Sequence, residues 1–267
     1  MKQINAVKAI ALNTFRETVR DRILYALIFF ALVVTVLGII LGSLSVGQDI
    51  RILKDIGLAT ISVIGGIIAV FAGTNLVYKE LERRTIYIIF TKPVSGWQFV
   101  LGKYIGLCLC VFVMVAAMGA FLTLIITIST GNYALPVVAH QIIEVGQELS
   151  LIYLELLFVT ALATFFSTFS TPVMSVLFTL SIWLAGHLGK SLLELGKLSQ
   201  NQTLEQFLTV VFYCLPDFAG LTQIRGHLLY GIHPGLEVML YLITYVLAYV
   251  LMLLVLAAIV TERKEFT

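Results

Sequence analysis

Charged residues are scarce in this chain of 267 residues. Only 12% of its residues are Asp, Glu, Lys or Arg, whereas 60% are hydrophobic. A soluble domain carries about 25% charged residues, so this composition excludes an ordinary soluble protein. The mean hydropathy of +1.02 agrees with that exclusion. We therefore expect an integral membrane protein.

Cysteine and histidine are also few, with three and four copies. Cys108 and Cys110 do not share a helix face, and Cys214 lies far along the chain. Ligands scattered in this way predict no metal site, and they do not form the convergent set that a membrane enzyme needs. We interpret the thiols as small apolar residues in helix packing.

Two further signatures are missing. The sequence has no G-x-x-x-x-G-K-[ST] phosphate loop, so it predicts no ATP site, no catalytic residue and no cofactor in this chain. It shows no convincing internal repeat and almost no charge inside its apolar runs, which argues against a stand-alone channel or secondary carrier.

What the chain does contain is long apolar segments. A helix that crosses the hydrocarbon core needs about 20 residues, and lipid offers no water to backbone groups. Five stretches without Asp, Glu, Lys or Arg meet this length: 23–48, 56–78, 104–143, 156–189 and 238–261.

The fourth stretch is long for one crossing and short for two. The polar run 167–172 lies in its middle and ends in Pro172, which favours two helices joined by a turn. We therefore predict a single all-α membrane domain, 1–267, with six spans. They cover approximately 23–44, 56–77, 104–129, 149–169, 172–189 and 236–260.

The distribution of basic residues predicts the orientation. Twelve of the 17 Lys and Arg residues lie before the first span, between the second and third spans, or after the last span. Because basic residues collect on the cytoplasmic side, we expect both termini in the cytoplasm. A single span in the fourth stretch would instead put the C-terminus outside.

The first residues, 1–22, show a helical pattern. Apolar side chains recur at helical spacing from Ile4 through Val7 and Ala11 to Val19. This pattern predicts an interfacial helix along the inner leaflet. The alternative is a fraying extension next to the membrane.

The predicted extracytoplasmic connection 190–235 contains a helix signal. Residues 203–206 have the form of a capping box, and an apolar stripe follows until Pro216 ends it. We expect a short helix there, followed by Pro216, Asp217 and Phe218. Two interpretations stay open for this connection: an outer gate or cap, and a re-entrant packing element without a moving role.

Glu155 is the best candidate for a pathway residue, because a charge inside a span is costly and usually functional. The alternative places it near the outer headgroups or in a helix contact, and the same alternative holds for His187. The near absence of other charges in the spans favours a lipid-like, hydrophobic or amphipathic cargo over an inorganic ion.

The densest cluster of charge lies in residues 78–103, between two apolar stretches. If this segment is helical, Glu80 and Arg84 share a face and pair, while Lys79 and Arg83 form a positive edge. Pro93 would end that helix. The physical reading allows either an ordinary solvated connection or a docking element for a cytoplasmic partner.

This segment resembles the permease subunits of ABC exporters of the second type. Their pattern is approximately E-x-E-R-x-x-G-T, then P-[VL]-S-R, then F-x-x-G-K-x-x-G. The matching residues are Glu80, Glu82, Arg83, Thr85, Pro93, Val94, Ser95, Phe99, Gly102, Lys103 and Gly106. Arg84 stands where Gly is common, and Gly96 where Arg is common, which bears on the subfamily.

The resemblance implies one half of an ATP-driven transporter in the inner membrane of a prokaryote. The segment after the second span would be a coupling helix that docks on separate ATPase subunits, which bind ATP and Mg. The implied coupling residues are Lys79, Glu80, Glu82, Arg83, Arg84, Thr85, Lys92 and Pro93.

The other implied partners are a second permease copy or a paralogue, the bilayer and an extracytoplasmic accessory protein, with no role for nucleic acid. The implied function is export of cargo. The alternative is a subunit that transmits ATP-driven motion to an extracytoplasmic partner without moving cargo itself.

Overall fold

The structure of the chain is a computed structural model. It describes residues 2–20, 25, 28–29, 31–36, 49–82, 95–131, 133–199, 202–229 and 235–265. The regular structure in these ranges is helical throughout. The helices are α1 (Lys2–Val19), α3 (Asp49–Glu82), α5 (Gly96–Thr130), α6 (Leu135–Ser167), α7 (Pro172–Leu198), α8 (Gln202–Cys214), α9 (Phe218–Leu229) and α10 (Leu236–Glu265).

Within the described residues, five helices are long and apolar enough to cross a membrane, or six if the bent pair α8 and α9 counts as one broken span. The all-α membrane fold is therefore confirmed. The first predicted span, 23–44, falls mostly outside the described ranges. Its described residues, at 25, 28–29 and 31–36, are helical.

The helices extend beyond the predicted spans. α5 begins eight residues before position 104, and α6 begins fourteen residues before position 149. At 1.5 Å per residue, the 33 residues of α6 measure roughly 50 Å, compared with about 30 Å of hydrocarbon. Charged residues end an apolar run in the sequence, but they do not end a helix.

The chain leaves the helical conformation at the polar run that was expected to divide the fourth apolar stretch. α6 ends at Ser167, and α7 begins at Pro172 after Thr171, whose backbone is extended at φ −71° and ψ 158°. Pro172 is compatible with this start because the first N–H groups of a helix have no partner within the helix.

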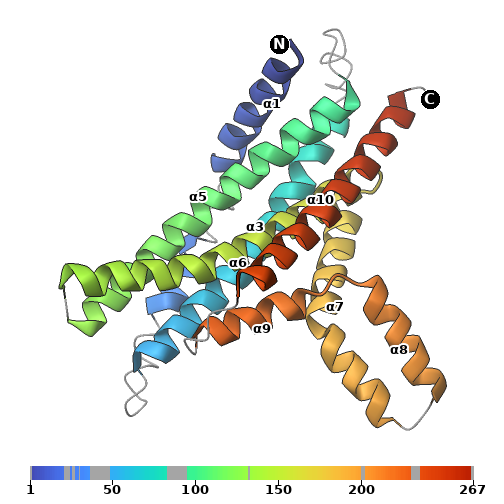
Figure 1. Cartoon of the computed structure of the whole chain (residues 1–267). Coiled ribbons are helices and arrows are strands. Elements are labelled where there is room, and N and C mark those ends of the chain that lie inside the picture. The colour runs from blue at the N-terminus through green and yellow to red at the C-terminus, as the bar shows by residue number, and fades with distance from the viewer. Residues whose placement is uncertain are drawn as a thin grey trace.

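The helices form a bundle in which α3, α5, α6 and α10 pack together and α1 lies along the first part of α5 (Figure 1). The largest side chains of its core include Leu107, Leu122 and Leu156, which have no exposed surface. Both termini lie at the same end of the bundle as the end of α3 and the start of α5, whereas α8 and α9 lie toward the other end (Figure 1).

The connection after α7 contains two helices where the sequence predicted one. The axes of α8 and α9 differ in direction by 79°. Pro216 lies in the break, as expected, but Asp217 then starts a new helix because its Oδ1 accepts the backbone N–H of Gly220 at 2.8 Å. α8 itself begins at Gln202, so Thr203 lies inside the helix and not at its N-cap.

Candidate functional site

The predicted coupling residues lie at the edge of the described structure. α3 continues as a helix through Lys79, Glu80 and Glu82. The side chains of these three residues, and the whole of 83–94, fall outside the described residues. This range includes Arg83, Arg84, Thr85, Lys92 and Pro93. The structure therefore describes the helices that flank this segment and their contacts, which we call the frame of the segment.

One part of this frame is the first turn of α5. The backbone N–H of Ser95 donates to Oε1 of Gln98 at 3.3 Å, which fixes the point where the chain re-enters a helix. The next two residues, Phe99 and Val100, are buried with Ala257 of α10. The exit from the charged segment is thus anchored to the last helix.

A second part of the frame is the contact between α1 and α5. Gly102 and Gly106 are four residues apart and present one surface without side chains. A Cβ on Gly102 would lie 2.8 Å from Cβ of Ile10, and one on Gly106 would lie 2.5 Å from the carbonyl oxygen of Ala11. Small residues at this spacing let two helices touch backbone to backbone.

The buried face of α1 differs in part from the predicted apolar stripe. Ala11 belongs to both, but the most buried polar residues are Thr14 and Thr18, with 0% and 3% exposure. Phe15 and Val19 pack beside them, partly buried. The hydroxyl of Thr18 donates to the carbonyl of Thr14, so this threonine brings no unpaired donor into the contact.

Glu155 lies in a contact between α6 and α7. Its side chain is buried, and its Oε1 accepts the indole N–H of Trp183 at 2.8 Å. Nε2 of His187 lies 3.3 Å from the same oxygen. Glu155 therefore takes part in a helix contact, and its role as a pathway residue stays a prediction.

The hydrogen-bond partners fix one proton on His187. Nδ1 lies 3.0 Å from the carbonyl oxygen of Trp183, and a carbonyl can only accept, so Nδ1 donates. The opposite ring nitrogen faces a carboxylate oxygen of Glu155. The contact between Nε2 and Oε1 joins α6 to α7.

The segment 216–218 packs on this pair. Phe218 stacks on the His187 ring with centroids 5.6 Å apart and meets the Phe158 ring edge-on at 5.0 Å. A Cβ on Gly186 would lie 2.5 Å from Cδ2 of Phe218 and 2.6 Å from the Pro216 carbonyl oxygen, so this position of α7 admits only glycine.

The same segment is tied to α10. The backbone N–H of Asp217 donates to the hydroxyl of Tyr245 at 3.1 Å. The structure thus brings Glu155 and residues 216–218 into one network that joins α6, α7, α9 and α10. In the sequence these are separate features, and Trp183 and Tyr245 were not predicted as partners. The four-residue spacing of Trp183 and His187 was the available signal.

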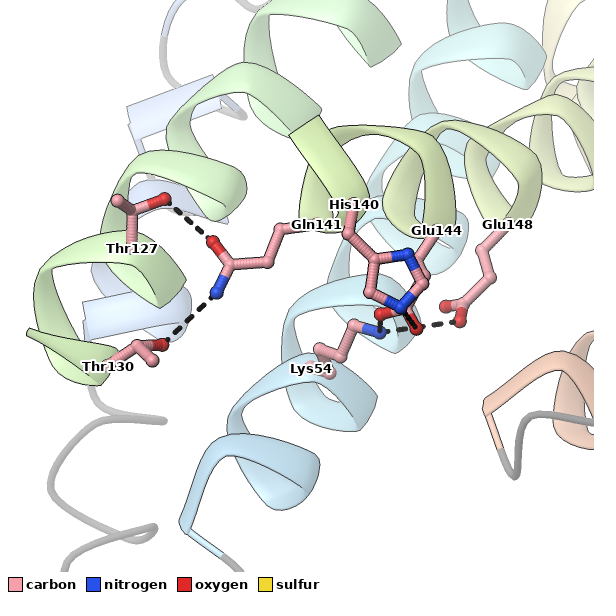
Figure 2. Close-up of polar contacts among 7 residues, drawn as sticks. All are labelled: Lys54, Thr127, Thr130, His140, Gln141, Glu144 and Glu148. Carbon is pink, nitrogen blue, oxygen red and sulfur yellow. Dashed lines mark hydrogen bonds and ion pairs between the residues drawn. The ribbon is translucent and has the colours of Figure 1, made fainter. Parts of the chain in front are cut away.

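A second polar cluster joins α3 to the first half of α6 (Figure 2). Nζ of Lys54 donates to Oε2 of Glu144 at 2.9 Å and lies 4.0 Å from Oε1 of Glu148. His140 contacts the other oxygen of Glu144 at 3.2 Å. The four-residue spacing of His140, Glu144 and Glu148 places all three on one face of α6.

The end of α5 is joined to the first turns of α6 beside this cluster. The amide of Gln141 accepts the hydroxyl of Thr127 at 3.0 Å and donates to that of Thr130 at 3.3 Å (Figure 2). Gly131 ends α5 in the left-handed conformation, with φ of 64°. Together these contacts hold the end of α5 against the first part of α6.

Within the described part of the chain, no three His, Cys, Asp or Glu residues come close enough to hold a metal ion. Cys108 and Cys110 are both buried. The sulfur of Cys110 lies 3.7 Å from that of Met114. These two thiols contribute to helix packing.

A comparison with protein families gave one result, and a search of curated proteins found no match. The family described as ABC-2 family transporter protein matches residues 8–265, which is almost the whole chain. The match covers α3 to α10 and most of α1, and it agrees with five or six apolar helices. The chain therefore belongs to the ABC-2 transporter family and is a multi-pass permease subunit of an ABC transporter.

Proposed function

We propose that this permease exports a hydrophobic or amphipathic cargo, driven by separate ATPase subunits that dock on the charged segment 78–103. Family membership implies an ABC ATPase as the partner. The observation that carries the docking assignment is the position of this segment. The two described helix ends that flank it, the end of α3 and the start of α5, lie at the end of the bundle that also holds both termini (Figure 1).

The frame of the segment supports a role in transmitting force. A docking element transmits motion only if its ends are attached to rigid helices. α5 begins at an anchored turn beside Ala257, and α1 lies against the backbone of α5 six to ten residues later. A force applied to segment 78–103 would therefore act on α1, α3, α5 and α10 together.

The coupling residues in this proposal are the eight named above, from Lys79 to Pro93. ATP and Mg belong to the ATPase subunits. Two permeases, identical or paralogous, would form the complete membrane part in the inner membrane of a prokaryote, with both termini in the cytoplasm. Switching such a machine between two states takes about 5.5 kcal/mol of differential binding.

The apolar cargo is supported by three buried hydroxyl groups in α6 and α7. Thr160, Thr164 and Thr179 each donate to a carbonyl oxygen four residues earlier in their own helix. Each of these hydroxyl groups therefore already donates its hydrogen within its own helix. Glu155 is likewise occupied by Trp183 and His187.

The export function predicts ATP-dependent movement of lipid-like cargo. The permease and its ATPase would be reconstituted in proteoliposomes and given a panel of fluorescent short-chain lipids and amphipathic dyes. We expect at least one probe to move with ATP and none to move with a non-hydrolysable analogue.

Turnover of ATP without movement of any probe would contradict export. It would favour the alternative, a subunit that transmits motion to an extracytoplasmic accessory protein. The specific feature that supports this alternative is the element formed by α8 and α9, which lies at the end of the bundle opposite the termini (Figure 1).

A further inference from the structure

One buried polar atom in the Lys54 cluster has no partner. Oε2 of Glu148 makes no hydrogen bond with any part of the chain that the structure describes. The side chain of Glu148 is only 2% exposed. A buried carboxylate oxygen without a donor is costly, because water no longer solvates its charge.

The nearest cation does not resolve this problem. The ammonium of Lys54 is 2.9 Å from Glu144 but 4.0 Å from Glu148, so its short contact is already used. The ammonium and the ionised Glu144 balance each other. An ionised Glu148 would leave a net negative charge in the cluster (Figure 2).

The charged groups around Glu148 come from three helices. Lys54 and Asp55 act on it from α3, Glu144 from α6 and Arg225 from α9. His140 contacts only Glu144 among the residues of Figure 2. Two cations, Lys54 and Arg225, therefore act on Glu148 together with two carboxylates, Asp55 and Glu144.

We propose that Glu148 is a proton-binding site in the arrangement of α3 and α6 that the structure describes. The structure favours a proton over a larger cation because the side chain is almost fully enclosed. The Oε2–H bond forms with a proton taken from water, and the same proton returns to water when Glu148 ionises.

This proposal rests on geometry that exists without the ATPase, so it is tested without the ATPase. Infrared spectra of the permease in lipid would be recorded at about pH 6, where an exposed glutamate, with an ordinary pKa of about 4.3, is ionised. We expect a carbonyl band of a protonated carboxyl that Glu148→Gln removes. Glu194→Gln, at an exposed position of α7, should leave the band unchanged.

A second variant separates a proton site from a merely structural residue. Glu144→Gln frees the Lys54 ammonium to approach Glu148, which favours the ionised form. As the pH is raised, the band should then disappear at a lower pH in Glu144→Gln than in the unmodified permease. A wild-type spectrum without the band, or a band that survives Glu148→Gln, would overturn the proton site. Either result leaves the proposed function intact, because that function is tested by transport.

Discussion

Replacing Gly106 with leucine is expected to separate α1 from α5 and to lower the free energy of unfolding by about 3 kcal/mol, the upper end for an overpacked site. A Cβ at this position already lies 2.5 Å from the Ala11 carbonyl oxygen and 2.7 Å from Cβ of Thr14. The first of these atoms is backbone, which cannot move aside as a flexible side chain can.

The effect would be measured by unfolding in mixed detergent and lipid micelles, together with proteolysis of α1. Gly146→Leu is the matched control. Gly146 lies in α6, and a Cβ there meets no atom within 4 Å. Equal stability and equal protection of α1 in the two variants would show that backbone contact at Gly106 does not hold α1.

Replacing Glu155 with alanine is expected to cost about 3 kcal/mol or more of stability. The change removes the acceptor of Trp183 and leaves His187 facing an apolar methyl group. Removing one partner of a buried pair typically costs about 3–5 kcal/mol. Glu155→Gln keeps an oxygen that accepts from Trp183, so it should lose less.

The Trp183 indole reports this change directly. The chain contains two tryptophans, so Trp97→Phe leaves Trp183 as the single fluorophore. In that background, Glu155→Ala should shift the emission and lower the unfolding midpoint. Glu194→Ala, at an exposed position, should do neither. An unchanged emission in Glu155→Ala would show that the indole does not depend on this carboxylate.

The location of most helices could be predicted from the sequence, because lipid demands long apolar runs and Pro172 marks a break within one. Their true lengths could not. The predicted fourth span began only at position 149, because Glu144 and Glu148 interrupt the apolar run before it. In the structure, Lys54 of α3 pairs with Glu144, which is 90 residues away in the chain.

The candidate site was predicted in its parts but not in its assembly. Glu155 stood out as a charge in an apolar run, and residues 216–218 stood out as a break after a helix. Their connection depends on His187, which stacks on Phe218 and contacts Glu155. Such contacts come from helix packing, and a single sequence does not encode them as a local pattern.

The coupling residues rest on the sequence pattern and on family membership. Because most of these residues are charged, the proposed docking surface can be tested by reversing their charges. Glu82→Lys, and separately Arg83→Glu with Arg84→Glu, would be compared with Lys197→Glu. Lys197 lies near the end of α7 and is exposed. All variants should insert into the membrane, because none of these changes falls within a predicted apolar span.

The measurement that tests the central claim most directly is co-purification of the ATPase with each variant, followed by its ATP hydrolysis rate. The account predicts that both reversals weaken co-purification and abolish stimulation of hydrolysis, while Lys197→Glu behaves as the unmodified permease. If the reversed permeases retain both the bound ATPase and its full stimulation, segment 78–103 is not the coupling element.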